Sequence, residues 1–278
     1  MSELQQFMDY ISDKKENTKK TYNLQYRKLR AILNKDIGKS GERTIIQAAQ
    51  TESNINSIQA LLNIGIMIRK MNGMEFKEID RVREKNRKNI NKNIKTNNAT
   101  IIEDLPSYQD LVKYVDKLYD DSNWVAYVIN YLLLNYQTRN QDILFDIVRL
   151  KRDILRDGKN YIWLPSNGKK VLYSRSDYKT SGTYGRKDIT ITDPKFILAI
   201  KRIVGCAKSG LKCGEIIPNP EQVGYTVKKM TLNQIGEAKY VKIVVDHFRG
   251  NLQKLKEISK NRGTSLETLL ESYDIKNI

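Results

Sequence analysis

The sequence has 278 residues and carries 49 lysines and arginines against 32 aspartates and glutamates, which gives a formal net charge of +17. This length suits one large or two modest domains. The cationic excess argues against a typical cytosolic metabolic enzyme and for a polyanionic partner, with nucleic acid first and a membrane surface second. No apolar stretch reaches spanning length and no signal peptide is found, so a membrane partner is not expected.

The cysteine and histidine content narrows the chemistry further. Cys206 and Cys213 flank a glycine-containing loop without a CxxC spacing, so a reduced, intracellular environment is the simpler inference. With His247 as the single histidine, neither a histidine zinc site nor a Ser-His-Asp triad is expected. We therefore predict no metal and no cofactor. His247 itself is interpreted as structural.

Apolar residues at helical spacing predict a small helical domain with a basic face in the first hundred residues. The glycine at Asn72-Gly73 ends one of these helices. The predicted helices cover 1–13, 17–33, 45–51, 54–71 and a run that starts at Phe76.

The stretch 85–100 is rich in lysine and asparagine, and it fits either an interdomain linker or the solvated end of a helix. In both cases its charge would suit a phosphate backbone. We therefore predict an N-terminal domain over 1–97 and a second domain over 102–278. The predicted DNA contacts in this region are Arg81, Lys85, Arg87 and Lys88.

The second domain is predicted to be helical around a small antiparallel sheet, so the fold class is mainly α with a small β component (α+β). The helix over 123–135 is apolar nearly all round and should be central to the core. After it, 136–144 predicts a short break and a new helix. The predicted strands are 161–164, 171–178 and 189–191, and the later helices are 194–204, 220–230, 236–248, 252–261 and a terminal one that ends at Tyr273.

Three side chains in this domain could take part in chemistry, and each also has a simpler structural interpretation. Arg139, with Asp142 three residues on, is placed to bind a phosphate through two parallel bonds, or it forms an ordinary surface ion pair. Lys179, at the tip of a predicted hairpin, is either a general acid or a solvated lysine. Tyr273 follows a Gly-Thr turn and is either a nucleophile or an amphipathic side chain that closes the core.

Taken together, these segments resemble the tyrosine recombinases and integrases and their relatives, the type IB topoisomerases. Residues 132–144 resemble the box that carries the first arginine of the family. Lys179 matches the hairpin lysine, 252–264 looks like the helix that leads to the Gly-His box, and Tyr273 falls at the spacing of the nucleophile. The resemblance implies a helical, SAM-like core-binding domain in 1–97 and a catalytic domain in 102–278.

The chain departs from the family pattern at three positions. By this alignment Gly236 replaces a histidine, Lys239 replaces the second arginine, and Thr264 stands where the family has histidine or tryptophan. Lysine keeps the charge but loses the planar fork, so Arg262 is an alternative source of a guanidinium.

The resemblance implies that DNA strands are cleaved and rejoined through a covalent phosphotyrosine, without metal or ATP. Tyr273 would attack phosphorus, Arg139 and Lys239 (or Arg262) would bind the phosphate, Lys179 would protonate the leaving oxygen, and Thr264 would donate one hydrogen bond.

The expected partner is double-stranded DNA, bound by a homo-oligomer (dimer or tetramer) wherever that DNA resides inside the cell. The abundance of lysine, asparagine and isoleucine hints at a viral or mobile element. The alternatives are a type IB topoisomerase and a DNA-binding relative with weakened catalysis.

Overall fold

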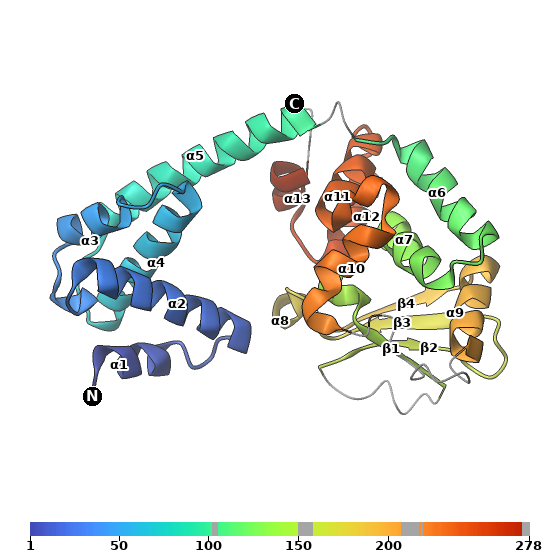
Figure 1. Cartoon of the computed structure of the whole chain (residues 1–278), viewed down its shortest axis with the longest axis horizontal. Helices are drawn as coiled ribbons and strands as arrows, with labels where there is room; N and C mark the ends of the chain where they lie inside the picture. Colours follow the sequence, from blue (N-terminus) through green and yellow to red (C-terminus); the bar gives the residue numbers. More distant parts are fainter. Residues whose placement is uncertain (102–104, 150–157, 207–216, 218, 274–278) are drawn as a thin grey trace. The chain divides into compact units, whose positions relative to one another are not determined.

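The computed structural model describes residues 1–101, 105–149, 158–206, 217 and 219–273. The chain divides into two compact units, Met1–Thr96 and Asn97–Ile278, and each has its own hydrophobic core. Figure 1 labels their helices and strands. Within the described residues, no helix is both long enough and apolar enough to cross a membrane.

The first unit is built from helices packed around an apolar core. Its core side chains include Phe7 and Tyr26, whose rings stack with centroids 5.3 Å apart. Glu3 fastens the unit, because its carboxylate accepts hydrogen bonds from the Tyr26 hydroxyl and from the backbone N–H groups of Ile37 and Gly38. The elements are α1 (Glu3–Tyr10), α2 (Glu16–Leu33), η1 (Ile37–Lys39), α3 (Glu42–Ala49), α4 (Ile55–Met71) and α5 (Lys77–Ile101).

Helix α5 includes the basic stretch 85–100, for which the sequence allowed either a linker or the end of a helix. It is continuous from Lys77 to Ile101, and the sequence from 74 to 105 contains no glycine or proline that would interrupt it. Ile79 is buried on its inner side, whereas Arg81, Lys85 and Lys88 are exposed.

The second unit surrounds the apolar helix α7, which contacts α6, α9, α10, α11 and α12 (Figure 1). Val128, Ile129 and Leu132 of α7 are completely buried, as the apolar pattern of this helix predicts. The helices are α6 (Tyr108–Asp120), α7 (Trp124–Tyr136), η3 (Asn140–Ile143), α8 (Ser181–Tyr184), α9 (Pro194–Cys206), η6 (Pro220–Gln222), α10 (Val223–Met230), η7 (Leu232–Gln234), α11 (Gly236–His247), α12 (Leu252–Arg262) and α13 (Leu266–Tyr273).

The prediction of a mainly α fold with a small sheet is confirmed, but the sheet differs from the one expected. In the described part of the chain it has four strands in sequence order: β1 (Phe145–Val148), β2 (Asn160–Trp163), β3 (Val171–Arg175) and β4 (Lys187–Ile191).

The sheet is mixed, and the prediction of an antiparallel sheet is wrong at its first edge. Strand β1 pairs parallel to β2, with Phe145 opposite Asn160, whereas β2–β3 and β3–β4 are antiparallel. The sequence predicts no strand at 145–148, because four residues are too few to show a recognisable strand pattern. Pairing with β2 decides its conformation.

Candidate active site

Arg262, the last residue of α12, lies at the centre of a polar cluster although its side chain is only 1% exposed. Its Nη1 donates to the carbonyl oxygen of Gln137 at 2.8 Å. Its Nη2 donates both to Oε1 of Glu237 at 2.7 Å and to the hydroxyl oxygen of Tyr273 at 2.6 Å. The guanidinium also lies over the Tyr273 ring, 4.7 Å from its centroid. A buried cation therefore contacts the phenol directly.

The turn between α12 and α13 brings Tyr273 to this cation. Gly263 ends α12 in the left-handed region, with φ of +61°. A Cβ there would also lie 2.7 Å from Oγ1 of Thr180, so the position requires glycine. Leu269 of α13 is fully buried, and α13 packs on α11 and α12. This packing directs Tyr273 inward.

Arg139 lies beside Arg262 on the segment that leaves α7. It is half-buried, and its Nη1 donates to the carbonyl oxygen of Arg262. Burial and the neighbouring Arg262 guanidinium both lower the pKa of Arg139, but an arginine side chain stays protonated at any ordinary pH. The Arg139 guanidinium therefore contacts the backbone of Arg262, and it lies near enough to the Arg262 guanidinium and to Tyr273 to interact with both electrostatically.

A buried ion pair holds the Arg139 segment against the end of α12. Asp142 accepts a hydrogen bond from the backbone N–H of Arg139 at 3.1 Å. The same carboxylate oxygen binds Nη1 of Arg175 at 2.9 Å. Arg175 is 1% exposed, and its Nη2 donates to the carbonyl oxygen of Asn261. The predicted Asp142 partner therefore orients Arg139 through its backbone, while Arg175 takes the side-chain pairing.

Lys187, at the start of β4, is a site residue that sequence reasoning missed. It is half-buried, its Nζ donates to the carbonyl oxygen of Lys260, and it lies 5.1 Å from the centroid of the Tyr178 ring. Burial first, and the nearby Arg175 next, lower the pKa of Lys187 to about 8. Such a lysine can exchange a proton near neutral pH.

Lys179, the predicted hairpin lysine, lies in the β3–β4 connection that leads to Lys187, and it is exposed. Its neighbour Thr180 attaches this loop to the site, because the Thr180 hydroxyl donates to the carbonyl oxygen of Gly263 at 2.7 Å. The loop is therefore in place beside the turn that precedes Tyr273, and a movement of the Lys179 side chain alone would change its distance from the site.

Of the two remaining predicted site residues, Thr264 lies near the cluster, whereas Lys239 has no described contact with it. Lys239 is exposed on α11, and none of the contacts described for the chain joins it to Arg139, Arg262 or Tyr273. Thr264 is half-buried and lines a hollow of about 500 Å³ together with Arg175 and Lys187. The guanidinium beside the tyrosine is thus that of Arg262, the alternative considered for the second arginine.

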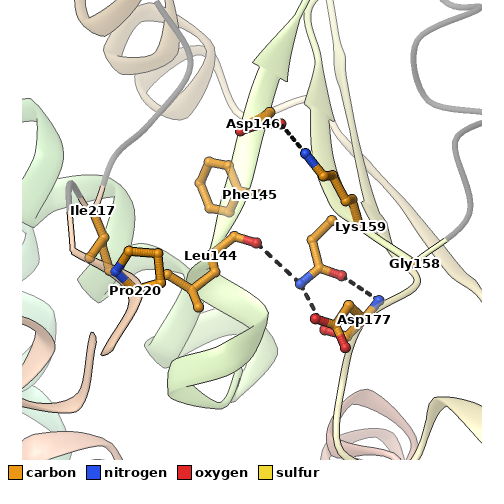
Figure 2. Close-up of a pocket in the computed structure, with 9 residues that line it drawn as sticks. Leu144, Phe145, Asp146, Gly158, Lys159, Asp177, Ile217 and Pro220 are labelled. Carbon is orange, nitrogen blue, oxygen red and sulfur yellow. Dashed lines mark hydrogen bonds and ion pairs between the residues drawn. The ribbon is translucent and has the colours of Figure 1, made fainter. Parts of the chain in front are cut away.

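Other polar features of this unit lie outside the cluster. The His247 ring stacks on Tyr108 with centroids 4.0 Å apart, which fits a structural residue. Another hollow, of about 320 Å³, is lined by residues that include Asp146, Lys159 and Asp177 (Figure 2). The Asn160 amide at its wall already bonds the carbonyl oxygens of Leu144 and Asp177. Among the residues the structure describes, no cluster of three His, Cys, Asp or Glu side chains could hold a metal ion.

Comparison with known proteins adds little to this geometry. No family model matches the sequence, and no curated protein matches it. Among solved structures the chain is similar to one described as the crystal structure of XerA recombinase, with a TM-score of 0.39 and 11% sequence identity over 99% of this chain and 94% of that one. A likeness this distant carries no argument about activity, so the function must be inferred from the site.

Proposed function

We propose that this protein cleaves and rejoins DNA strands through a covalent bond between Tyr273 and a DNA phosphate, as the resemblance to tyrosine recombinases implies. One observation carries the proposal: the Tyr273 hydroxyl lies 2.6 Å from a buried guanidinium. Attack by the phenol oxygen places extra negative charge on the phosphate oxygens, and fixed cations in a site shielded from water stabilise that charge strongly. Arg262 and Arg139 would supply the cations.

In the proposed reaction, the Tyr273 oxygen forms a bond to phosphorus as the bond from phosphorus to one DNA oxygen breaks. The departing oxygen takes a proton and becomes a free hydroxyl. Attack by that hydroxyl on the phosphotyrosine reverses both changes and rejoins the strand. One phosphoester replaces another in each direction, so no ATP is needed.

A lysine of the β3–β4 connection or of the start of β4 would donate the proton to the leaving oxygen. Lys179 is the sequence prediction, and Lys187 is the lysine whose pKa of about 8 suits proton transfer near neutral pH. Thr264, at the turn before α13, would donate a hydrogen bond to a phosphate oxygen. Lys239 stays a predicted phosphate ligand that would have to reach the site from the exposed side of α11.

The charge of the chain supports duplex DNA as the substrate. A net charge of +17 favours a polyanion. In addition, Arg81, Lys85, Lys88 and Lys92 recur every three or four residues on α5 and are all exposed, so they form one basic stripe along the helix. We propose that residues 1–97 act as a DNA-binding domain and that the protein assembles as a dimer or tetramer on paired sites.

The decisive experiment is to trap the covalent intermediate. Incubation with a nicked duplex, from which the short cleaved strand diffuses away, should give a DNA adduct that survives denaturation. The Tyr273→Phe variant should give none while binding the same duplex equally well. If folded protein that binds the duplex forms no such adduct, the proposal is contradicted and a DNA-binding role remains. Relaxation of any supercoiled plasmid would indicate a type IB topoisomerase, whereas a need for paired sites would indicate a recombinase.

The stripe on α5 can be tested by salt dependence. Removing two phosphate contacts with Arg81→Ala and Lys88→Ala together should lower the slope of log K against log salt by about 2. Arg87, another predicted DNA contact, projects from a different side of α5 by the 3.6-residue period. Arg87→Ala is therefore the matched control and should change the slope less. Equal slopes for the double variant and the unaltered protein, measured by titration of labelled duplex, would exclude the stripe from the interface.

A further inference from the structure

We propose that the Glu237 carboxylate is the base that takes the hydroxyl proton of Tyr273 as the phenol oxygen attacks phosphorus. The inference rests on the proposed function and adds to it the destination of this proton. A tyrosine hydroxyl ordinarily has a pKa near 10, so attack near neutral pH requires a group that removes the proton as the new bond forms.

Glu237 has the position that this role requires. Its Oε1 and the Tyr273 hydroxyl oxygen both accept hydrogen bonds from the same nitrogen, Nη2 of Arg262, at 2.7 and 2.6 Å. The two oxygens can therefore be no farther apart than the sum of those distances. Because the Tyr273 oxygen acts as the acceptor in that bond, its own hydrogen remains available for a carboxylate.

The backbone holds the carboxylate toward the site. Oε2 of Glu237 accepts a hydrogen bond from the backbone N–H of Asn140 at 3.3 Å, one residue after Arg139. Glu237 belongs to the first turn of α11, where the helix dipole favours a negative charge. Its side chain is 14% exposed, so bulk water has little access to the proton that would be transferred.

Two other candidate bases in the described part of the chain, His247 and Asp142, lie elsewhere. His247, the single histidine of the chain, is at the other end of α11, about 15 Å along the axis from Glu237, and it stacks on Tyr108. Asp142 is paired with Arg175, and none of its described contacts involves Arg262 or Tyr273. Glu237 is the carboxylate that shares a guanidinium nitrogen with the phenol.

The proton and electron balance is complete with groups already present. The Tyr273 proton moves to the Glu237 carboxylate, which becomes a carboxylic acid, while the phenol oxygen bonds phosphorus and the DNA oxygen leaves with a proton from a lysine. Rejoining reverses each transfer, so the acid returns its proton to the departing phenol oxygen. In protein kinases, an aspartate carboxylate likewise accepts the proton of the attacking substrate hydroxyl.

A second role for Glu237 makes the opposite prediction. A carboxylate on Arg262 occupies a donor that a DNA phosphate could use, and as an anion it repels that phosphate. If this competition dominated, removal of the charge would tighten DNA binding and speed cleavage. If Glu237 is the base, removal of the charge slows cleavage by about 10²–10⁴-fold.

The test compares Glu237→Gln and Glu237→Ala in single-turnover adduct formation on the nicked duplex. Both should be slowed by about 10²–10⁴-fold with DNA binding retained. Sodium formate, but not sodium chloride at the same ionic strength, should restore part of the rate of Glu237→Ala, because formate can enter the space left and accept the proton. Glu267→Gln removes an exposed carboxylate from α13 and should behave like the unaltered protein.

Each other result overturns the proposal. A rate for Glu237→Gln that equals or exceeds the unaltered rate shows that no base was lost. Slow cleavage in both variants without recovery in formate assigns Glu237 to holding Arg262. If the unaltered protein forms no adduct at all, the proposed function itself fails. Thermal unfolding of each variant, measured by circular dichroism, confirms that the comparison is made between folded proteins.

Discussion

The variant Arg262→Lys is expected to cleave DNA at least about a hundredfold more slowly than the unaltered protein. Arg262 uses its two terminal nitrogens for three partners, the carbonyl oxygen of Gln137, the Glu237 carboxylate and the Tyr273 hydroxyl. A lysine keeps the charge but has a single nitrogen on a flexible chain. It therefore cannot bond all three partners in the planar arrangement of a guanidinium and also bind a phosphate. Single-turnover adduct formation on the nicked duplex measures the loss.

Two companion variants make this result specific. Arg202 is an exposed arginine on α9, so Arg202→Lys controls for the replacement of an arginine by a lysine and should leave the rate unchanged.

Lys239→Ala tests the position that the sequence alignment assigned to the second cation. If Lys239→Ala abolished cleavage while Arg262→Lys did not, the phosphate would be bound from the exposed side of α11, and Arg262 would only organise the core of the site. Loss of a buried bond at Arg262 should also lower the free energy of unfolding by about 1–3 kcal/mol, which thermal melts would detect.

The second large effect on the cleavage rate is expected from replacing Lys187, the proposed proton donor. Lys187→Ala should slow cleavage of an ordinary phosphodiester by about 10²–10⁴-fold, because the leaving oxygen then departs without a proton. A substrate with sulfur in place of the leaving oxygen should be cleaved by this variant at nearly the unaltered rate, because a thiolate needs no proton to leave. The comparison of the two substrates separates a general acid from a residue that only supports the fold.

Lys179→Ala is the matched control, because Lys179 lies in the β3–β4 connection that leads to Lys187, the first residue of β4. The exposed position of Lys179 predicts a smaller effect than that of Lys187→Ala. Should Lys179→Ala be the variant that sulfur rescues, the sequence alignment would be right and the loop would move when DNA binds. Equal loss on both substrates in both variants would remove the general acid from the mechanism.

The pH dependence of cleavage follows from the same lysine. The folded-state pKa of Lys187 is lowered to about 8, so the protonated form that the proposed general acid requires declines as pH rises through that value. The rate on the oxygen substrate should therefore fall above about pH 8, and the rate on the sulfur substrate should not. Persistence of the alkaline decline in Lys187→Ala would assign it to another group. The measurement is a set of single-turnover rates at constant ionic strength.

Local patterns were sufficient for most of the helical part of this protein. The period of apolar residues predicts α2, α4 and α7 because each presents one face, or all of itself, to a core. The same patterns place Arg139 just after a buried helix and Tyr273 at the end of an amphipathic one. Gly263 is recognisable in the same way, because a glycine that follows a helix indicates a left-handed cap.

Strand β1 and the β4 lysine were beyond that kind of reasoning. Phe145–Val148 is a strand because β2 offers it a partner, and its own four residues carry no decisive period. Lys187 becomes a chemical candidate only because β4 places it against Arg175 and the end of α12. In the sequence it is one lysine among many in a basic chain.

The sequence by itself determined a basic, mainly helical chain with Arg139 just after its most apolar helix and Tyr273 at the end of an amphipathic one. Only the tertiary structure decided which charges surround that tyrosine. It brings Arg262 to Gln137, 125 positions away in the chain, and to Glu237, 25 positions away, and it leaves Lys239 exposed. The physical reason is that burial and pairing of a charge depend on segments distant in sequence, which no local period records.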